Sequence, residues 1–327
     1  HSIFFIHGLQ GHPRSTWSFP NERSQPQTRR NGFRERFAQA FRSRSGDGSD
    51  QEPTRVFWPQ DLLGESFPEL RIFTYGYDSH VTHWFKGPAM QLDILSHGES
   101  LLSGLAARRM EAPQRPIILV VHSLGGLVIK DMLRRARSSS DPRFKSIHQA
   151  TKAIIFFGTP HHGGNYINIG LTAQKIVAAS GLNASDRLLR DLKFDSSIAK
   201  MLSEEFTHFL DERKPIVYTF QEASGLSGFG PLSGKVVEDV SSSLEYPLQF
   251  KDHIYANHMD MCRFTGPLDD GYEKVNAAMR HILSGDMQAA PQGMASPLRD
   301  VFACLTWIYR IILTECTPAR ELYQRAS

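Results

Sequence analysis

One serine lies in a sequence context typical of a nucleophile. Ser123 follows the run Ile117-Ile-Leu-Val-Val-His122, whose five apolar residues predict a buried parallel strand. Residues 127–133 have the pattern of an amphipathic helix, so Ser123 lies in a tight turn from strand to helix. Such a turn lifts the serine Oγ above the carboxyl edge of a sheet and turns helix N–H groups toward a developing oxyanion. One departure is Val121, since the position two before such a serine is usually small.

A second glycine-flanked turn near the start of the chain is predicted to complete an oxyanion hole. Residues 2–6 form a short apolar strand, and His7-Gly-Leu-Gln-Gly11 follows it. A loop of this kind donates the second N–H to an oxyanion in serine acyl-transfer sites. The sequence therefore predicts that the N–H groups of Leu9 and Leu124 form the oxyanion hole.

Together with other motifs, these turns resemble those of α/β-hydrolases. The resemblance is to the lipase/esterase-like group found in eukaryotic serine-active-site proteins and at the N-termini of fungal NLR-type receptors. The segments that carry it extend over roughly residues 1–283: His7-Gly-Leu9 with Trp17, Phe73-Thr-Tyr-Gly-Tyr-Asp78, His122-Ser-Leu-Gly-Gly126, Phe156-Phe-Gly-Thr-Pro-His-His-Gly163 and Asn257-His-Met-Asp-Met-Cys-Arg-Phe264. The resemblance implies an α/β fold with a mostly parallel central sheet flanked by helices, with a helical cap insertion.

The catalytic base is expected among 14 histidines. In this fold the triad runs serine, acid, histidine along the chain, which favours His258 in a loop after the last predicted strands. The resemblance also matches His258 to the active-site histidine of the family. His161 and His162 end a strand and can line the site or close a turn, and His253 lies in a polar segment.

The acid has three candidates. Residues 215–220 read as a strand, and Glu222 follows it where this fold usually presents its carboxylate. Glu238 and Asp239, after another short apolar run, compete for the role, although exposed strand ends also carry such residues. Glu222 is the preferred acid, and Asp260 is expected to fix the loop that carries the histidine.

The domain organisation follows from the same segments. Residues 1–283 are predicted to form the hydrolase domain, with a cap or lid insertion at about 164–213, then a linker at 284–300 and a C-terminal helical extension at 301–327. The cap region has apolar residues at helical spacing, which favours an acyl or otherwise hydrophobic substrate.

Composition restricts the partners. A formal charge of +3 gives no support for nucleic-acid binding, and neither metal-ligand spacing nor a nucleotide or dinucleotide motif occurs, so no cofactor is expected. Three cysteines form no disulfide framework, which favours an intracellular, cytoplasmic setting, with an N-terminal targeting segment left open. Phe33, Phe37 and Phe41 alternate with arginines, a pattern compatible with a surface helix or with peripheral membrane contact.

The expected function is hydrolysis of a lipophilic carboxylic ester by a triad of Ser123, His258 and Glu222 through an acyl-enzyme. Two alternatives stay open. An alcohol in place of water would give an acyltransferase or a lactone-forming enzyme, and a weakly active domain would serve as a signalling or interaction module.

Overall fold

The structure is a computed structural model of the 327-residue chain. It describes residues 1–20, 55–79, 89–161, 167–179, 196–226, 228 and 233–287. The chain divides into two units, His1–Ile282 and Leu283–Ser327, and most of the second lies outside the described residues. The site described below belongs to the first unit. Several predicted segments lie outside the described residues, namely the helix with Phe33, Phe37 and Phe41, most of the linker at 284–300 and the helix at 301–327.

A six-stranded sheet forms the centre of the first unit. Its strands are β1 (Ser2–Ile6), β4 (Arg71–Tyr75), β5 (Ile117–His122), β6 (Thr151–Phe157), β7 (Ile216–Glu222) and β8 (Gln249–Ile254). Their order is β4-β1-β5-β6-β7-β8, and each neighbouring pair is parallel. Every residue of β1 and β5 is buried, as expected for strands covered by helices on both faces. All carboxyl ends therefore meet at one edge of the sheet.

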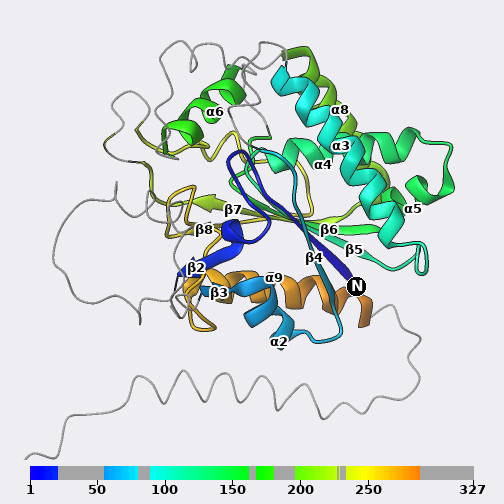
Figure 1. Cartoon of the computed structure of the whole chain (residues 1–327), viewed down its shortest axis with the longest axis horizontal. Coiled ribbons are helices and arrows are strands. Elements are labelled where there is room, and N and C mark those ends of the chain that lie inside the picture. The colour runs from blue at the N-terminus through cyan, green and yellow to red at the C-terminus, as the bar shows by residue number, and fades with distance from the viewer. Residues whose placement is uncertain are drawn as a thin grey trace, which may run out of the picture. The chain divides into compact units, whose positions relative to one another are not determined.

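Helices cover both faces of this sheet (Figure 1). On one face α4 (Gly125–Ser138) packs against α3 (Ala89–Arg108), α5 (Pro142–Ala150) and α8 (Ser196–Arg213). The opposite face carries α9 (Asp270–Met287) and the short α2 (Gly64–Ser66). The predicted α/β fold, with a mostly parallel sheet between helical layers, is confirmed. The core lies between these layers and consists mainly of apolar residues from the strands and from the helices that face them.

Aromatic side chains fill the space between the sheet and α9. Phe5 of β1 contacts the rings of Trp17 and Trp58, each with a centroid distance of 5.1 Å, and Trp58 contacts Phe264 at the same distance. Trp17 ends a 3-10 turn (Ser15–Trp17), and Trp58 separates β3 (Arg55–Phe57) from a π-helical turn (Pro59–Leu63). β3 pairs with β2 (Ser18–Pro20) in a small antiparallel sheet. This cluster supports the loop between β8 and α9.

The predicted cap region is described in two parts. The first, α6 (Ile167–Ala179), contacts the segment after β7, whereas α8 packs against α4 in the layer that flanks the sheet. Residues 180–195 between them lie outside the described part of the chain. The predicted boundaries of the cap, linker and extension stay predictions.

Candidate active site

Ser123 occupies the turn between β5 and α4, as the sequence predicts. Its φ of 55° lies in the left-handed region, which a serine adopts only where the surroundings enforce it. Two contacts do so: the Ser123 N–H donates to the Phe157 carbonyl at 2.8 Å, and the Thr159 hydroxyl donates to the Ser123 carbonyl at 2.9 Å. The turn is thus held against the neighbouring strand β6, and Val121 does not prevent it from forming.

His258 brings its imidazole to this hydroxyl from 135 residues further along the chain. Its Nε2 lies 2.8 Å from Ser123 Oγ, and both side chains are buried. This separation allows the hydroxyl to donate to the ring nitrogen, which is the arrangement a general base needs. The two residues that the sequence selected for nucleophile and base are therefore in direct contact.

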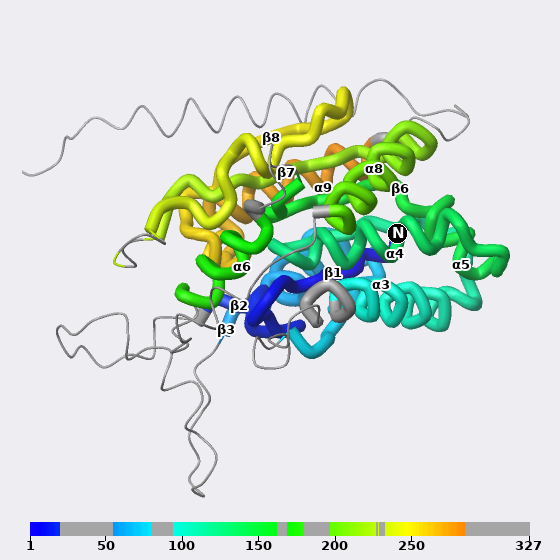
Figure 2. Tube along the Cα trace, turned by 90° about the horizontal axis from the view of Figure 1, so that it is seen from above, coloured from blue at the N-terminus to red at the C-terminus, as the bar shows by residue number. Residues whose placement is uncertain are grey.

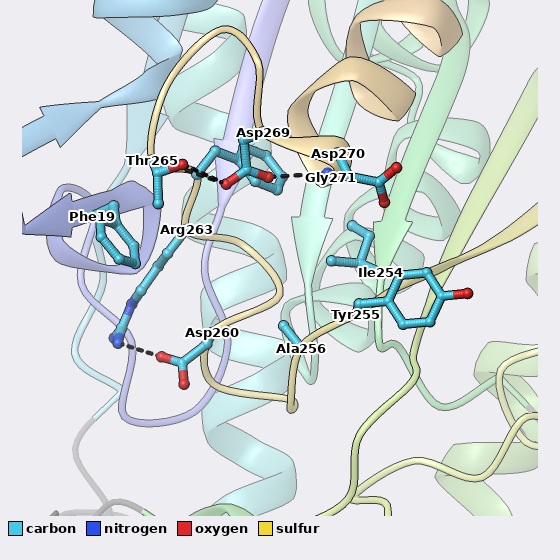
Figure 3. A pocket seen from close by; sticks show the side chains of 11 residues that line it. Phe19, Ile254, Tyr255, Ala256, Asp260, Arg263, Thr265, Asp269, Asp270 and Gly271 are labelled. Carbon is cyan, nitrogen blue, oxygen red and sulfur yellow. Dashed lines mark hydrogen bonds and ion pairs between the residues drawn. The ribbon is translucent and has the colours of Figure 1, made fainter. Parts of the chain in front are cut away.

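The loop that carries His258 is held by its own side chains. Asn257 Oδ1 accepts from the Met259 N–H at 2.9 Å, and Asn257 Nδ2 donates to Asp260 at 2.8 Å. Asp260 also accepts from Arg263 at 3.0 Å. Figure 3 shows this last pair at one side of a pocket of about 400 Å³. Asp260 thus has the loop-fixing position that the sequence suggests.

His122 joins the histidine loop to the nucleophile strand. Its Nε2 lies 3.0 Å from the backbone carbonyl of His258. A carbonyl only accepts, so this nitrogen carries the hydrogen. Burial, and then the neighbouring ring of His258, hold the pKa of His122 well below its usual range, so the ring is neutral at neutral pH. The residue before the nucleophile therefore fixes the backbone of the base.

Glu222 is the last residue of β7. Its carboxylate lies on the Nδ1 side of the His258 ring, whereas Ser123 lies on the Nε2 side. The distance from Glu222 Oε1 to His258 Nδ1 is 3.4 Å, and both side chains are fully buried. The same oxygen accepts the Val237 N–H at 2.6 Å. Glu238 and Asp239 face other partners: Glu238 is 66% exposed, and Asp239 pairs with Lys235 at 2.7 Å. Of the three carboxylates considered from sequence, the structure brings only Glu222 to the imidazole.

Of the proposed oxyanion donors, Leu124 follows the serine directly, and Leu9 follows Gly8, whose backbone passes close to the Ser123 side chain. Leu9 and Leu124 are buried, and within the described residues neither backbone N–H has a hydrogen-bond acceptor. Buried N–H groups are seldom left without an acceptor, so such a pair beside a nucleophile suits an anion that forms only during reaction. Gly8 allows the approach, since a Cβ there would lie 3.3 Å from Leu124 N.

The rival histidines have other surroundings. His161 packs edge-on against Phe156 at 4.4 Å and stacks over Phe206 at 6.3 Å. His253 is about half exposed and lies 3.7 Å from Asp239. His162 lies outside the described residues. These contacts of His161 and His253 are with residues other than Ser123.

Three site residues escaped prediction from sequence. Gly158 has a φ of 53°, and a Cβ there would come within 2.9 Å of the His258 ring. Thr159 holds the carbonyl of Ser123, and Val237 binds the acid through its backbone. The Gly158-Thr159 pair at the end of a buried strand is a pattern from which the first two could have been predicted. Nothing in the residue type of Val237 indicates its contact, because any residue but proline has the N–H. Across the described ranges, no group of His, Cys, Asp and Glu side chains is arranged to hold a metal ion.

The chain has the α/β-hydrolase fold, with the sheet order, the serine at the turn after β5 and the later acid and histidine that this fold carries. It is similar to Protein SERAC1 of Mus musculus, with 28% identity over 221 residues, and to Protein SERAC1 of Danio rerio, with 26% identity over 264 residues. The matches cover 67% and 80% of this chain but only 30% and 36% of those proteins.

The solved structures that resemble this chain include the mature lipase BlEst2 of Bacillus licheniformis, at 16% identity and a TM-score of 0.42. That match covers 86% of this chain and 91% of the lipase. The RedJ thioesterase of Streptomyces coelicolor matches at 11% identity, with a TM-score of 0.40, over 86% of this chain and 89% of its own. No family model matches the sequence. No helix among the described residues has the length and apolar character needed to cross a membrane.

Proposed function

We propose that this protein is a serine hydrolase that cleaves a lipophilic carboxylic ester through an acyl-enzyme. The single observation that carries the proposal is the 2.8 Å contact between His258 Nε2 and Ser123 Oγ at a strained strand-to-helix turn. A serine hydroxyl is a weak nucleophile until a base takes its proton, and this contact places the base where the proton leaves.

The reaction begins with attack of Ser123 Oγ on the carbonyl carbon of the ester, while His258 Nε2 takes the hydroxyl proton. The carbonyl oxygen becomes an oxyanion, which accepts from the N–H groups of Leu9 and Leu124. His258 then returns the proton to the leaving alkoxide, and the acyl group stays on Ser123. Water then attacks the acyl carbon while His258 takes one of its protons, and the carboxylic acid leaves as His258 returns that proton to Ser123 Oγ.

Glu222 has a separate role in this scheme. His258 becomes an imidazolium in each transition state, and a buried carboxylate near Nδ1 stabilises that charge and keeps the hydrogen on Nδ1. The low exposure of both groups strengthens their attraction, because little water screens it.

The substrate class is proposed from the apolar surroundings of the serine. Leu9 and Leu124 belong to the same buried cluster as Ile169 and Ala173 of α6. Apolar walls suit an acyl chain better than a charged substrate. An alcohol that replaces water would convert the same enzyme into an acyltransferase, so product analysis belongs in the test.

A fluorophosphonate probe and p-nitrophenyl esters of short and medium chain length test this function. Wild type should label and turn over, and Ser123→Ala should lose the label and about 10³-fold or more of kcat. His258→Ala should lose a similar factor. Ser146→Ala is the matched control, since Ser146 is also buried but donates to the Arg143 carbonyl of α5. Labelling that persists in Ser123→Ala, or a wild type that neither labels nor turns over, would overturn the proposal and favour an interaction module.

A further inference from the structure

The acid of the triad is bound more closely by a backbone N–H than by the histidine. Glu222 Oε1 lies 2.6 Å from the Val237 nitrogen but 3.4 Å from His258 Nδ1. Within the described residues His258 Nδ1 makes no hydrogen bond, and neither does Glu222 Oε2. The position of Val237 therefore sets how near the carboxylate comes to the imidazole.

Val237 belongs to a segment that we term the strap, residues 233–239, which crosses the end of β7. Its first part pairs with Leu226, since Gly234 and Leu226 exchange two backbone hydrogen bonds of 2.8 Å. Its last residue is held by Gln221, whose amide donates to the Asp239 carbonyl at 2.8 Å. Both ends of the strap are therefore held by residues of β7 or of the turn directly after it.

The middle of the strap is held from the other side by α6. Lys175 Nζ donates to the Lys235 carbonyl at 2.5 Å, and Thr172 Oγ1 donates to the Val236 carbonyl at 3.5 Å. Val236 and Val237 share one apolar cluster with residues of α6. Figures 1 and 2 both show α6 beside the segment that follows β7.

Lys175 makes this contact with most of its side chain buried. The side chain is 10% exposed, and its nearest carboxylate, Glu238, is 66% exposed at 4.0 Å. An exposed ion pair of that length contributes little, whereas a charged donor on a carbonyl makes a strong hydrogen bond. The main partner of the Lys175 ammonium is therefore the backbone of the strap, two residues before the N–H that holds Glu222.

We propose that Lys175 is a positioning residue for the triad acid, acting from α6 through the strap and the Val237 N–H on Glu222. The proposal rests on the proposed hydrolase function. It makes α6, which follows the strand next to the nucleophile, part of the machinery that orients His258. A shift of α6 would move the strap and hence the carboxylate.

The kinetic test uses Lys175→Met, which keeps the aliphatic stem and removes the donor. We expect kcat to fall about 10-fold with KM little changed, because misplacing an orienting group weakens transition-state stabilisation more than binding. In a Glu222→Gln background the same change should cost nothing further, since the group it positions is already altered. Lys200→Met, at an exposed lysine that pairs with Glu204, is the control and should match wild type. An unchanged kcat in Lys175→Met, or an equal loss in both backgrounds, would overturn the proposal.

A second measurement separates this inference from the hydrolase function. The proton on His258 Nδ1 should give a downfield NMR signal that is absent in His258→Gln, and Lys175→Met should shift or broaden it while Lys200→Met leaves it unchanged. This readout needs no substrate. If wild type fails to turn over esters but the signal responds to Lys175, the function fails and the positioning role stands. If the signal is the same in Lys175→Met and wild type, the proposed positioning role is wrong, even in an active enzyme.

Discussion

A Cβ placed on Gly8 would lie 2.7 Å from the Cβ of Ser123 and 2.9 Å from the His122 carbonyl. Real Cβ atoms do not approach others so closely, so only glycine allows the first loop to pass this near the nucleophile. The consequence is chemical as well as steric, because the next residue in that loop is Leu9, a proposed oxyanion donor.

Gly8→Ala should therefore push the first loop away from Ser123 and withdraw the Leu9 N–H. Removing one oxyanion donor typically costs about 3 kcal/mol of transition-state stabilisation, and we expect kcat to fall by about 10²-fold. Gly266→Ala is the control, since a Cβ there meets nothing within 4 Å. Steady-state kinetics on a p-nitrophenyl ester distinguishes the two, and a Gly8→Ala enzyme with wild-type kcat would exclude Leu9 from the oxyanion hole.

His122 offers a second kinetic prediction, through its bond to the His258 carbonyl. His122→Phe removes the donor and leaves a buried carbonyl unpaired, which typically costs about 1–3 kcal/mol of stability. It should also loosen the loop of the base and lower kcat by about 10-fold. His122→Gln keeps a donor and should lose less of both. Equal losses in the two variants, measured by urea unfolding and by kcat, would show that the hydrogen bond is not what matters.

The sequence predicted the parts of this site that depend on local pattern and chain order. Ser123 follows from a buried strand and an amphipathic helix, and His258 from the order of residues in the fold. Glu222 competed with Glu238 and Asp239, because all three flank short apolar runs and local pattern does not show which carboxylate is buried. The contact of Val237 with Glu222 joins backbone to side chain across 15 residues, and no periodicity reports it.

Lys130 shows the same limit within a helix that was predicted correctly. A lysine on an amphipathic helix normally faces water, yet this one is only 2% exposed. The reason is α8, which packs on α4 and places the Phe206 ring 5.1 Å from the Lys130 ammonium. Because α8 begins 66 residues after Lys130, the sequence pattern around Lys130 does not indicate this burial.

The two buried tryptophans give a matched stability test. Trp58 Nε1 donates to the Cys262 carbonyl at 2.9 Å, in the loop of His258, whereas Trp17 Nε1 has no acceptor within the described residues. Both side chains are fully buried, and replacing either one by Phe removes the same volume. Trp58→Phe should therefore lower the free energy of unfolding by about 1–2 kcal/mol more than Trp17→Phe. Urea unfolding measures the difference, and a larger loss for Trp17→Phe would contradict it.

The buried ammonium of Lys130 predicts how stability depends on pH. Burial lowers its pKa from the ordinary value of 10.5 to about 7. Below pH 7 the group is charged in the folded and the unfolded state, and the cost of burying the charge is fully present. Between pH 7 and 10.5 the unfolded chain binds more protons than the folded protein, so this group makes stability rise with pH in that window.

Lys130→Met removes this dependence and keeps the volume of the side chain. The variant should be more stable than wild type at pH 6.5, and the gain should shrink by on the order of 2 to 3 kcal/mol by pH 9.5. The cation–π contact with Phe206 favours the charged form and opposes part of the gain. Urea unfolding of both proteins at the two pH values, with the exposed Lys200→Met as control, measures the difference. A gain that stays constant across this range would mean that Lys130 does not change its protonation on folding, and its ammonium would then have to find water or an acceptor despite its burial.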